Sequence, residues 1–257
     1  IVTDDKTGKQ RKWVFKVPQS DTMAVEAIYT HLKKRGINKV AIMSATSGYG
    51  GSGQGELKRL APDYVMTIVA DEKYGNKDTD LTAQLTKIKG TDAQAIVNWT
   101  IGPAQITVLR NWRDLGMTKI TFYQSHGFGS RRNIELADGA AEGVFAPLGA
   151  CTTPEALAAD HPQKAVTMAY NADYMAAYNE PISAFGAHAW DALTLVAEAL
   201  KAVGGDKAAI RDYIEDKKGF VGQHGVFNFS PDDHNGLTWQ DAFNMIVVKD
   251  GDWAVTD

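Results

Sequence analysis

The sequence predicts an α/β fold in which helices cover both faces of a parallel sheet. Between Trp13 and about Pro147, short β-rich runs alternate with stretches in which apolar residues recur at helical spacing. Helix-ending signals separate them, as at Arg35-Gly36 and Leu115-Gly116. Strands that alternate with helices in this way need crossover connections, and these connections produce parallel strands buried on both faces.

The individual elements of this first part follow from local signals. Ser20-Asp21 can cap the first helix, and Leu81, Leu85 and Ile88 mark the apolar face of a later one. The predicted strands, in chain order, are residues 13–17, 39–44, 65–70, 93–98, 119–123 and 143–146.

After Pro147 the pattern changes. The predicted elements here, in chain order, are a helix at 163–179, an apolar helical stripe at 185–200, a helix at 207–215 and strands at 225–229 and 244–248. Asp250-Gly251 then turns the chain into Trp253. Three helices with so few strands cannot close a sheet and leave apolar faces uncovered. This part therefore either packs on the preceding one or belongs with strands that are absent from the chain.

Composition excludes several classes of protein. A net charge of −4 over 257 residues, with no long run of Lys or Arg, argues against nucleic acid as a partner. No segment approaches the run of about 18 apolar residues that a membrane helix needs. The single cysteine, Cys151, excludes an intramolecular disulfide.

Motifs for catalysis and for metal binding are missing from the sequence. G-x-S-x-G, C-x-x-C and H-E-x-x-H do not occur. His188 lies on the apolar stripe and is interpreted as a hydrogen-bonded core residue. Four histidines have no second ligand at metal spacing: His31, His161, His224 and His234. We therefore predict no catalytic residue, no metal and no cofactor, in a protein that is not an enzyme.

One glycine-rich segment competes with that prediction. Gly48-Tyr49-Gly50-Gly51-Ser52-Gly53 matches the dinucleotide motif G-x-G-x-x-G, and acidic residues follow about twenty positions later. Three residues, however, separate the motif from its strand, and a complete βα unit precedes it. Gln54-Gly55 after the motif also predicts a poorly formed helix N-terminus where a pyrophosphate would bind. An NAD(P)-dependent enzyme that uses residues 48–53 stays an alternative function.

Three loops carry the candidate binding site. They follow successive strands at 46–50, 99–103 and 125–129, and such loops share one edge of a parallel sheet, where ligands bind. Small residues mixed with aromatic and imidazole side chains are typical of a mostly apolar pocket with few polar anchors. The plainer interpretation, turns with locally packed aromatics, stays open for each single loop. The candidate ligand-binding residues are Ser47, Tyr49, Trp99, Thr100, His126 and Phe128.

Several segments resemble one known family. They are, in chain order, 13–17 (WVFKV), 40–42 (VAI), 47–50 (SGYG), 138–144 (DGAAEGV), 222–229 (GQHGVFNF) and 250–253 (DGDW). In order and spacing they are similar to the periplasmic solute-binding proteins of ABC importers, in the branched-chain amino-acid (Leu/Ile/Val) receptor group.

The resemblance implies a type I periplasmic-binding-protein fold. Two α/β lobes, with parallel sheets flanked by helices, are joined by three crossings and close on a ligand. It also implies that the first lobe is incomplete, since family members carry a further segment ahead of the one that matches Trp13. The implied domains are 1–17, a remnant of the first lobe with a crossing strand; 18–147, a complete second lobe; 148–248, the returning part of the first lobe; and 249–257, a C-terminal tail.

The resemblance also assigns roles to the candidate residues. Tyr49 matches an aromatic residue that lines the pocket, and Trp99 or Thr100 falls where another aromatic sits. His126 falls where amino-acid receptors place an acidic residue against the ligand ammonium. An imidazole cannot replace that carboxylate as the partner of a cation. An α-amino acid would therefore lose a charge-assisted hydrogen bond worth about 1.5–3 kcal/mol. We therefore expect a small carboxylate instead of an α-amino acid, and an aromatic one would suit Tyr49, Trp99 and Phe128.

The implied partners are a small-molecule ligand and the membrane permease of an ABC importer, with a periplasmic or extracytoplasmic location. Uncovered helix faces and strand edges in an incomplete lobe predict self-association of the chain. A ligand-sensing regulatory protein on the same fold is an alternative function.

Overall fold

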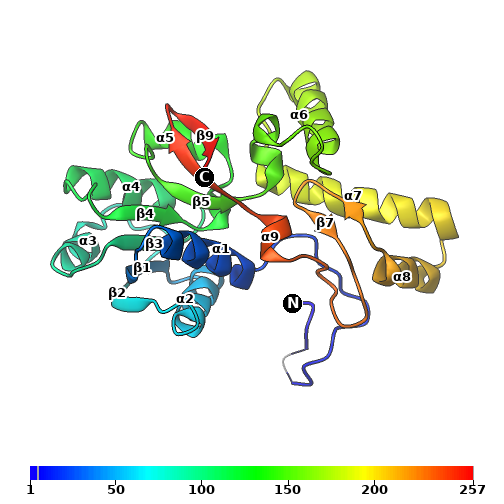
Figure 1. The fold of residues 1–257 in the computed structure, drawn as a ribbon, viewed down its shortest axis with the longest axis horizontal. Coiled ribbons are helices and arrows are strands. Elements are labelled where there is room, and N and C mark those ends of the chain that lie inside the picture. The colour runs from blue at the N-terminus through cyan, green and yellow to red at the C-terminus, as the bar shows by residue number, and fades with distance from the viewer. Residues whose placement is uncertain (5, 257) are drawn as a thin grey trace. The chain divides into compact units, whose positions relative to one another are not determined.

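Two units make up the part of the chain that the computed structural model describes, residues 1–4 and 6–256 (Figure 1). Unit 1 contains Ile1–Ser20 and Gly149–Phe243, and unit 2 contains Asp21–Leu148 together with the residues from Asn244 onward. The chain therefore passes between the units three times, after Ser20, after Leu148 and after Phe243.

Unit 2 is built on a sheet with the strand order β2-β1-β3-β4-β5-β8-β9. Its parallel strands are β1 (Lys39–Ala45), β2 (Thr67–Tyr74), β3 (Ala95–Trp99), β4 (Thr121–Gln124) and β5 (Phe145–Leu148). Every residue of β3 is buried, which is expected for a parallel strand covered on both faces. The predicted parallel α/β architecture is therefore confirmed for this unit.

Helices cover both faces of this sheet, as the crossover connections require (Figure 1). They are α1 (Asp21–Lys34), α2 (Gly48–Leu60), α3 (Thr82–Lys89), α4 (Ala104–Asp114) and α5 (Arg131–Ala137). A single-turn helix, η1 (His126–Phe128), follows β4. The core between the sheet and helices α3 to α5 contains Met43, Leu85, Ile96, Leu109 and Phe122, all fully buried.

The register of the strands places their carboxyl ends level. Ser44 of β1 lies opposite Trp99 of β3, and Asn98 of β3 lies opposite Gln124 of β4. Because β1, β3 and β4 are neighbours and parallel, the loops that leave them start at the same edge of the sheet.

Two antiparallel strands complete the sheet of unit 2. They are β8 (Asn244–Lys249), which pairs with β5, and β9 (Asp252–Val255), which pairs with β8. The family resemblance assigns residues 244–248 to the first lobe, whereas the structure places them in unit 2. Ile246 and Val248 are buried in the core of unit 2, so the edge of β5 gains a partner and two apolar side chains leave water.

Unit 1 consists mainly of helices. They are η2 (Ala150–Thr152), η3 (Pro154–Ala156), α6 (Lys164–Tyr178), α7 (Ala184–Val203), α8 (Lys207–Asp216) and α9 (Trp239–Ala242). The strand predicted at 225–229 is short in the structure, where β7 (Val226–Phe227) pairs only with β6 (Phe220–Val221). The predicted helices at 163–179, 185–200 and 207–215 correspond to α6, α7 and α8.

The strand predicted at 13–17 does not form; among the described residues this segment belongs to no sheet. Lys16 N–H donates to the carbonyl of His234 at 2.9 Å, and Phe15 stacks on the His234 ring with 4.2 Å between centroids. Trp13 keeps 58% of its surface exposed. The segment is β-prone, but main-chain and side-chain contacts with His234 hold it in place of pairing with a strand.

Candidate ligand-binding site

The three predicted loops leave adjacent parallel strands of unit 2 at the carboxyl edge of the sheet. The first starts helix α2 after β1, the second follows β3, and the third forms η1 after β4. This arrangement is the one in which open α/β sheets bind ligands.

Helix α2 begins directly in the first loop. Ser47 is its N-cap residue, and the Ser47 hydroxyl accepts the Gly50 N–H at 3.1 Å. The sequence predicts a poorly formed helix N-terminus here, and that prediction is wrong, because the glycines lie inside a regular helix. The N–H groups of this first turn lack partners within the helix and favour negative charge.

Close packing accounts for the glycine spacing in α2. A Cβ atom at Gly50 would overlap with the Ala45 carbonyl, and one at Gly53 would overlap with the Trp99 ring. Both glycines therefore let the helix approach the ends of β1 and β3. The G-x-G-x-x-G match thus has a structural explanation that needs no dinucleotide.

Tyr49 is the centre of the polar contacts at this edge. Its hydroxyl donates to Ser125 Oγ at 3.1 Å and lies 3.4 Å from His126 Nδ1. Ser125 Oγ in turn donates to the carbonyl of Thr100 at 3.3 Å, which links all three loops. Burial raises the pKa of Tyr49, so its phenol keeps its proton at neutral pH.

Three rings pack around these hydrogen bonds. The Tyr49 centroid lies 6.1 Å from that of Trp99 and 5.6 Å from that of His126, and the Trp99 and His126 centroids are 5.8 Å apart. Trp99 has no exposed surface, whereas Tyr49 and His126 are partly exposed. Trp99 therefore supports the two rings that reach the surface.

A carboxylate that the sequence does not place in the site lies beside His126. Asp21, the first residue of α1, has its Oδ1 atom 3.8 Å from His126 Nε2. Each of the two side chains is only 16% exposed, and Asp21 also accepts a hydrogen bond from Ser52 of α2. In the sequence Ser20-Asp21 is recognisable only as a helix cap, since the packing of α1 beside α2 is a tertiary feature.

Two of the predicted residues do not present a side chain at the edge. Phe128 is fully buried, and its ring contacts Trp253 edge-to-face with 5.5 Å between centroids. Thr100 is also fully buried and meets the site through its carbonyl group. The structure therefore brings Ser47, Tyr49 and His126 together at the surface, with Trp99 behind them and Phe128 in the core.

A buried layer of amide side chains fixes the strand ends beneath the loops. Tyr74 donates to Asn98 at 2.6 Å, Asn98 donates to Gln124 at 2.8 Å, and Gln124 donates to the Gln105 carbonyl at 3.3 Å. None of Asn98, Gln124 and Gln105 is more than 1% exposed. Such a paired network holds the starting points of the second and third loops in place.

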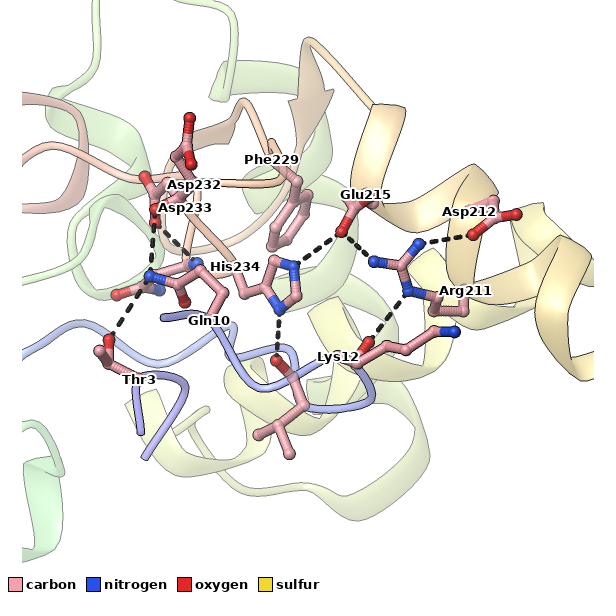
Figure 2. A network of polar contacts seen from close by, with 12 residues as sticks. Thr3, Gln10, Lys12, Arg211, Asp212, Glu215, Phe229, Asp232, Asp233 and His234 are labelled. Carbon is pink, nitrogen blue, oxygen red and sulfur yellow. Dashed lines mark hydrogen bonds and ion pairs between the residues drawn. The ribbon is translucent and has the colours of Figure 1, made fainter. Parts of the chain in front are cut away.

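A second polar cluster, in unit 1, joins the N-terminal segment to α8 and to the loop around His234 (Figure 2). His234 Nε2 lies 3.0 Å from Glu215 Oε1, and His234 Nδ1 lies 2.9 Å from the Val14 carbonyl. Arg211 pairs with Glu215 and donates to the Lys12 carbonyl at 3.0 Å. Both ring nitrogens of His234 face protein oxygens and the residue is 1% exposed, so this cluster is structural.

No group of three or more His, Cys, Asp or Glu side chains in residues 1–4 and 6–256 is arranged to hold a metal ion. Within the same residues, none of the helices combines the length and apolarity that a membrane crossing requires.

An α/β unit and a mainly helical unit joined by three crossings, with polar and aromatic side chains at the carboxyl edge of a parallel sheet, have the organisation of a receptor for small molecules. The chain belongs to the periplasmic binding protein family, whose family model matches residues 2–252. No curated protein matches it significantly by sequence.

Solved structures of similar proteins agree with this assignment. An extracellular ligand-binding receptor from Rhodopseudomonas palustris HaA2 is 30% identical, with a TM-score of 0.87, and the match covers 95% of this chain and 70% of that one. Rp1789 from R. palustris CGA009 is 29% identical, with a TM-score of 0.87 and coverages of 96% and 71%. The branched-chain amino-acid binding protein LivJ from Streptococcus pneumoniae, in complex with isoleucine, is 25% identical, with a TM-score of 0.79 and coverages of 98% and 69%.

Proposed function

We propose that the protein is the extracytoplasmic solute-binding component of an ABC importer, which holds a small molecule without transforming it and presents it to a membrane permease. The observation that carries this proposal is the convergence of the α2 N-terminus, Tyr49, Ser125 and His126 on one edge of the sheet. Family membership supports a binding role.

The ligand that this edge suits is a small carboxylate. The Ser47 hydroxyl accepts from Gly50 N–H and keeps its own proton to donate, and the helix N-terminus behind it favours an anion. The partly exposed His126 imidazole adds a group that can donate to a carboxylate, whereas the buried Ser125 hydroxyl already donates to the Thr100 carbonyl. The partly exposed Tyr49 ring offers an apolar surface, which favours an aromatic carboxylate.

Asp21 favours a second candidate ligand, an α-amino acid. Its carboxylate lies 3.8 Å from His126 and could accept hydrogen bonds from an ammonium group. This carboxylate comes from α1 and not from the third loop, so the argument from His126 alone does not exclude an amino acid.

A panel of compounds tested by thermal shift and calorimetry separates these candidates. The panel contains 4-hydroxybenzoate, phenylacetate, benzamide, leucine, isoleucine and NAD⁺. We expect the two aromatic acids to stabilise the protein and benzamide, which lacks the charge, to have no effect. Tyr49→Phe should weaken binding of the acids about tenfold, since the Tyr49 ring loses the hydrogen bond to Ser125 Oγ that fixes it beside the α2 N-terminus.

The matched control is Tyr64→Phe, which removes a phenol hydroxyl from the turn after α2, outside the three loops. It should leave the affinity unchanged. If leucine or isoleucine stabilises the protein and Asp21→Asn abolishes this stabilisation, the ligand is an α-amino acid and not an aromatic carboxylate. Stabilisation by NAD⁺ alone would overturn the solute-binding proposal.

We also propose that the chain associates with a second copy through α7. This helix carries four exposed apolar side chains at spacings of one helical face: Leu193, Val196, Leu200 and Val203. Exposed apolar faces of this kind mark association surfaces.

A further inference from the structure

The three points at which the chain passes between the units are tied together inside unit 1. They follow Ser20, Leu148 and Phe243. Gln19 lies just before the first point, Gly149 just after the second, and Ala242 just before the third. All three residues are buried, and the side chains of His224 and Gln19 connect them.

His224 contacts two of the crossing segments directly and is linked to the third through Gln19. Its Nδ1 atom lies 2.8 Å from Gln19 Nε2, and the other proton of that amide goes to the Ala242 carbonyl at 3.2 Å. Gly149 packs directly against the ring, because a Cβ atom there would overlap with His224 Nδ1 and lie 3.3 Å from Gln19 Nε2. One imidazole and one amide therefore hold the three segments together.

The tautomer of His224 follows from these contacts. Its Nε2 atom lies 2.9 Å from the Ala184 carbonyl, which can only accept, so Nε2 carries the proton. Nδ1 is then the acceptor for the Gln19 amide. Burial lowers the pKa of His224 to about 4, which keeps this neutral form at physiological pH.

The rest of unit 1 holds His224 rigidly. Its backbone N–H donates to Asp191 at 3.2 Å, and its ring stacks on His188 with 3.7 Å between centroids. Ala184, His188 and Asp191 all belong to α7, so the ring is anchored to the longest helix of unit 1.

We propose that His224 is a positioning residue for ligand capture, because it holds Gln19 and Gly149, and through Gln19 the Ala242 carbonyl, in one block fixed to α7. Rotation of unit 2 against unit 1 is then confined to the few bonds beyond this block, at Ser20, Leu148 and Phe243. The proposal rests on the proposed function, since a receptor that closes on its ligand needs a defined hinge.

The test measures the distance between the units in solution without any ligand. Spin labels are attached at Lys33→Cys in unit 2 and Lys207→Cys in unit 1, two exposed helical positions away from the apolar face of α7, while the buried Cys151 is left in place. Pulsed electron spin resonance then gives the distribution of label–label distances. Gln19→Met should broaden this distribution at least about 1.5-fold, since the three segments can then move separately.

Gln163→Met is the matched control. Gln163 is 3% exposed and donates to the Gly222 carbonyl at 2.9 Å, so its loss removes a buried amide hydrogen bond of unit 1 away from the crossings. It should lower the thermal midpoint about as much as Gln19→Met and leave the distance distribution unchanged. A distribution that is unaltered in Gln19→Met, or equally broadened in Gln163→Met, would overturn the proposal.

Gly149→Ala provides a second variant if Gln19→Met does not fold. Its methyl group displaces the His224 ring and should also broaden the distribution. An unchanged distribution in a folded Gly149→Ala protein would contradict the proposal as well. Because no ligand is present in these measurements, failure of the hinge proposal is distinguishable from failure of the compound panel.

Discussion

At the scale of single residues, Asp191 is a carboxyl group without exposed surface, in the middle of α7. It accepts the backbone N–H groups of Gln223 at 2.6 Å and of His224 at 3.2 Å. Burial raises the pKa of Asp191 to about 7, although these two hydrogen bonds act in the opposite direction. The residue therefore couples the stability of unit 1 to pH.

Asp191 and His224 make opposing contributions to the pH dependence of the unfolding free energy. Folded Asp191 binds its proton up to about pH 7, whereas unfolded Asp loses it near pH 4, so this group lowers the unfolding free energy as pH rises between these values. Folded His224 stays neutral down to about pH 4, whereas unfolded His is protonated below about pH 6.5. That group raises the unfolding free energy over nearly the same range.

Asp191→Asn removes the contribution of Asp191 and leaves that of His224. The Asn oxygen can still accept the two N–H groups, so the variant should gain stability relative to wild type as pH rises from 4.5 to 7.5, by about 2–4 kcal/mol. Denaturant unfolding at several pH values measures this difference. Parallel pH profiles for the two proteins would show that Asp191 does not titrate as the structure implies.

At the scale of elements, α2 shows how one helix serves both fold and site. Ser47 caps it, Tyr49 projects from its first turn, and Gly53 allows it to touch Trp99. The helix therefore sets the position of the aromatic ring against which Tyr49 and His126 pack.

Gly53→Ala should destabilise the protein by about 1–3 kcal/mol, because the added methyl overlaps with the buried Trp99 ring. The same variant should change the tryptophan fluorescence and weaken binding at the edge. Gly51→Ala in the same helix is the control, since open space surrounds that position and alanine is the better helix former by about 1 kcal/mol. Equal unfolding free energies for the two variants would refute this account of the glycine spacing.

The elements also show what sequence can predict. Strands β1, β3 and β4 lie within about two residues of their predicted bounds, since continuous apolar runs mark buried parallel strands. The failures at 13–17 and 244–248 concern pairing, because a β-prone run does not specify its neighbour. In the candidate site, strand order, loop composition and the family resemblance together predict Ser47, Tyr49 and His126. The position of Asp21 beside His126 depends on how α1 packs, which the sequence does not specify.

At the scale of the whole molecule, the exposed side of α7 is the surface through which we propose that two copies of the chain associate. Leu193 is 72% exposed and Leu200 is 46% exposed. We expect light scattering to show a mass that rises with concentration, because burying these side chains between two copies removes apolar surface from water.

Leu193→Gln combined with Leu200→Gln should return the chain to a monomer. Lys201→Gln, an exposed polar change on the same helix, should leave the association unchanged. A wild-type protein that stays monomeric at all concentrations would contradict this prediction.

The amide layer beneath the site has a consequence for how this protein can diversify. Tyr74, Asn98 and Gln124 satisfy one another and a main-chain carbonyl, and these bonds do not include the exposed side chains of the edge. Substitutions at Ser47, Tyr49 or His126 therefore leave no buried amide without a partner. Replacements at these three positions can therefore alter the candidate site while the strand ends that carry it keep their hydrogen bonds.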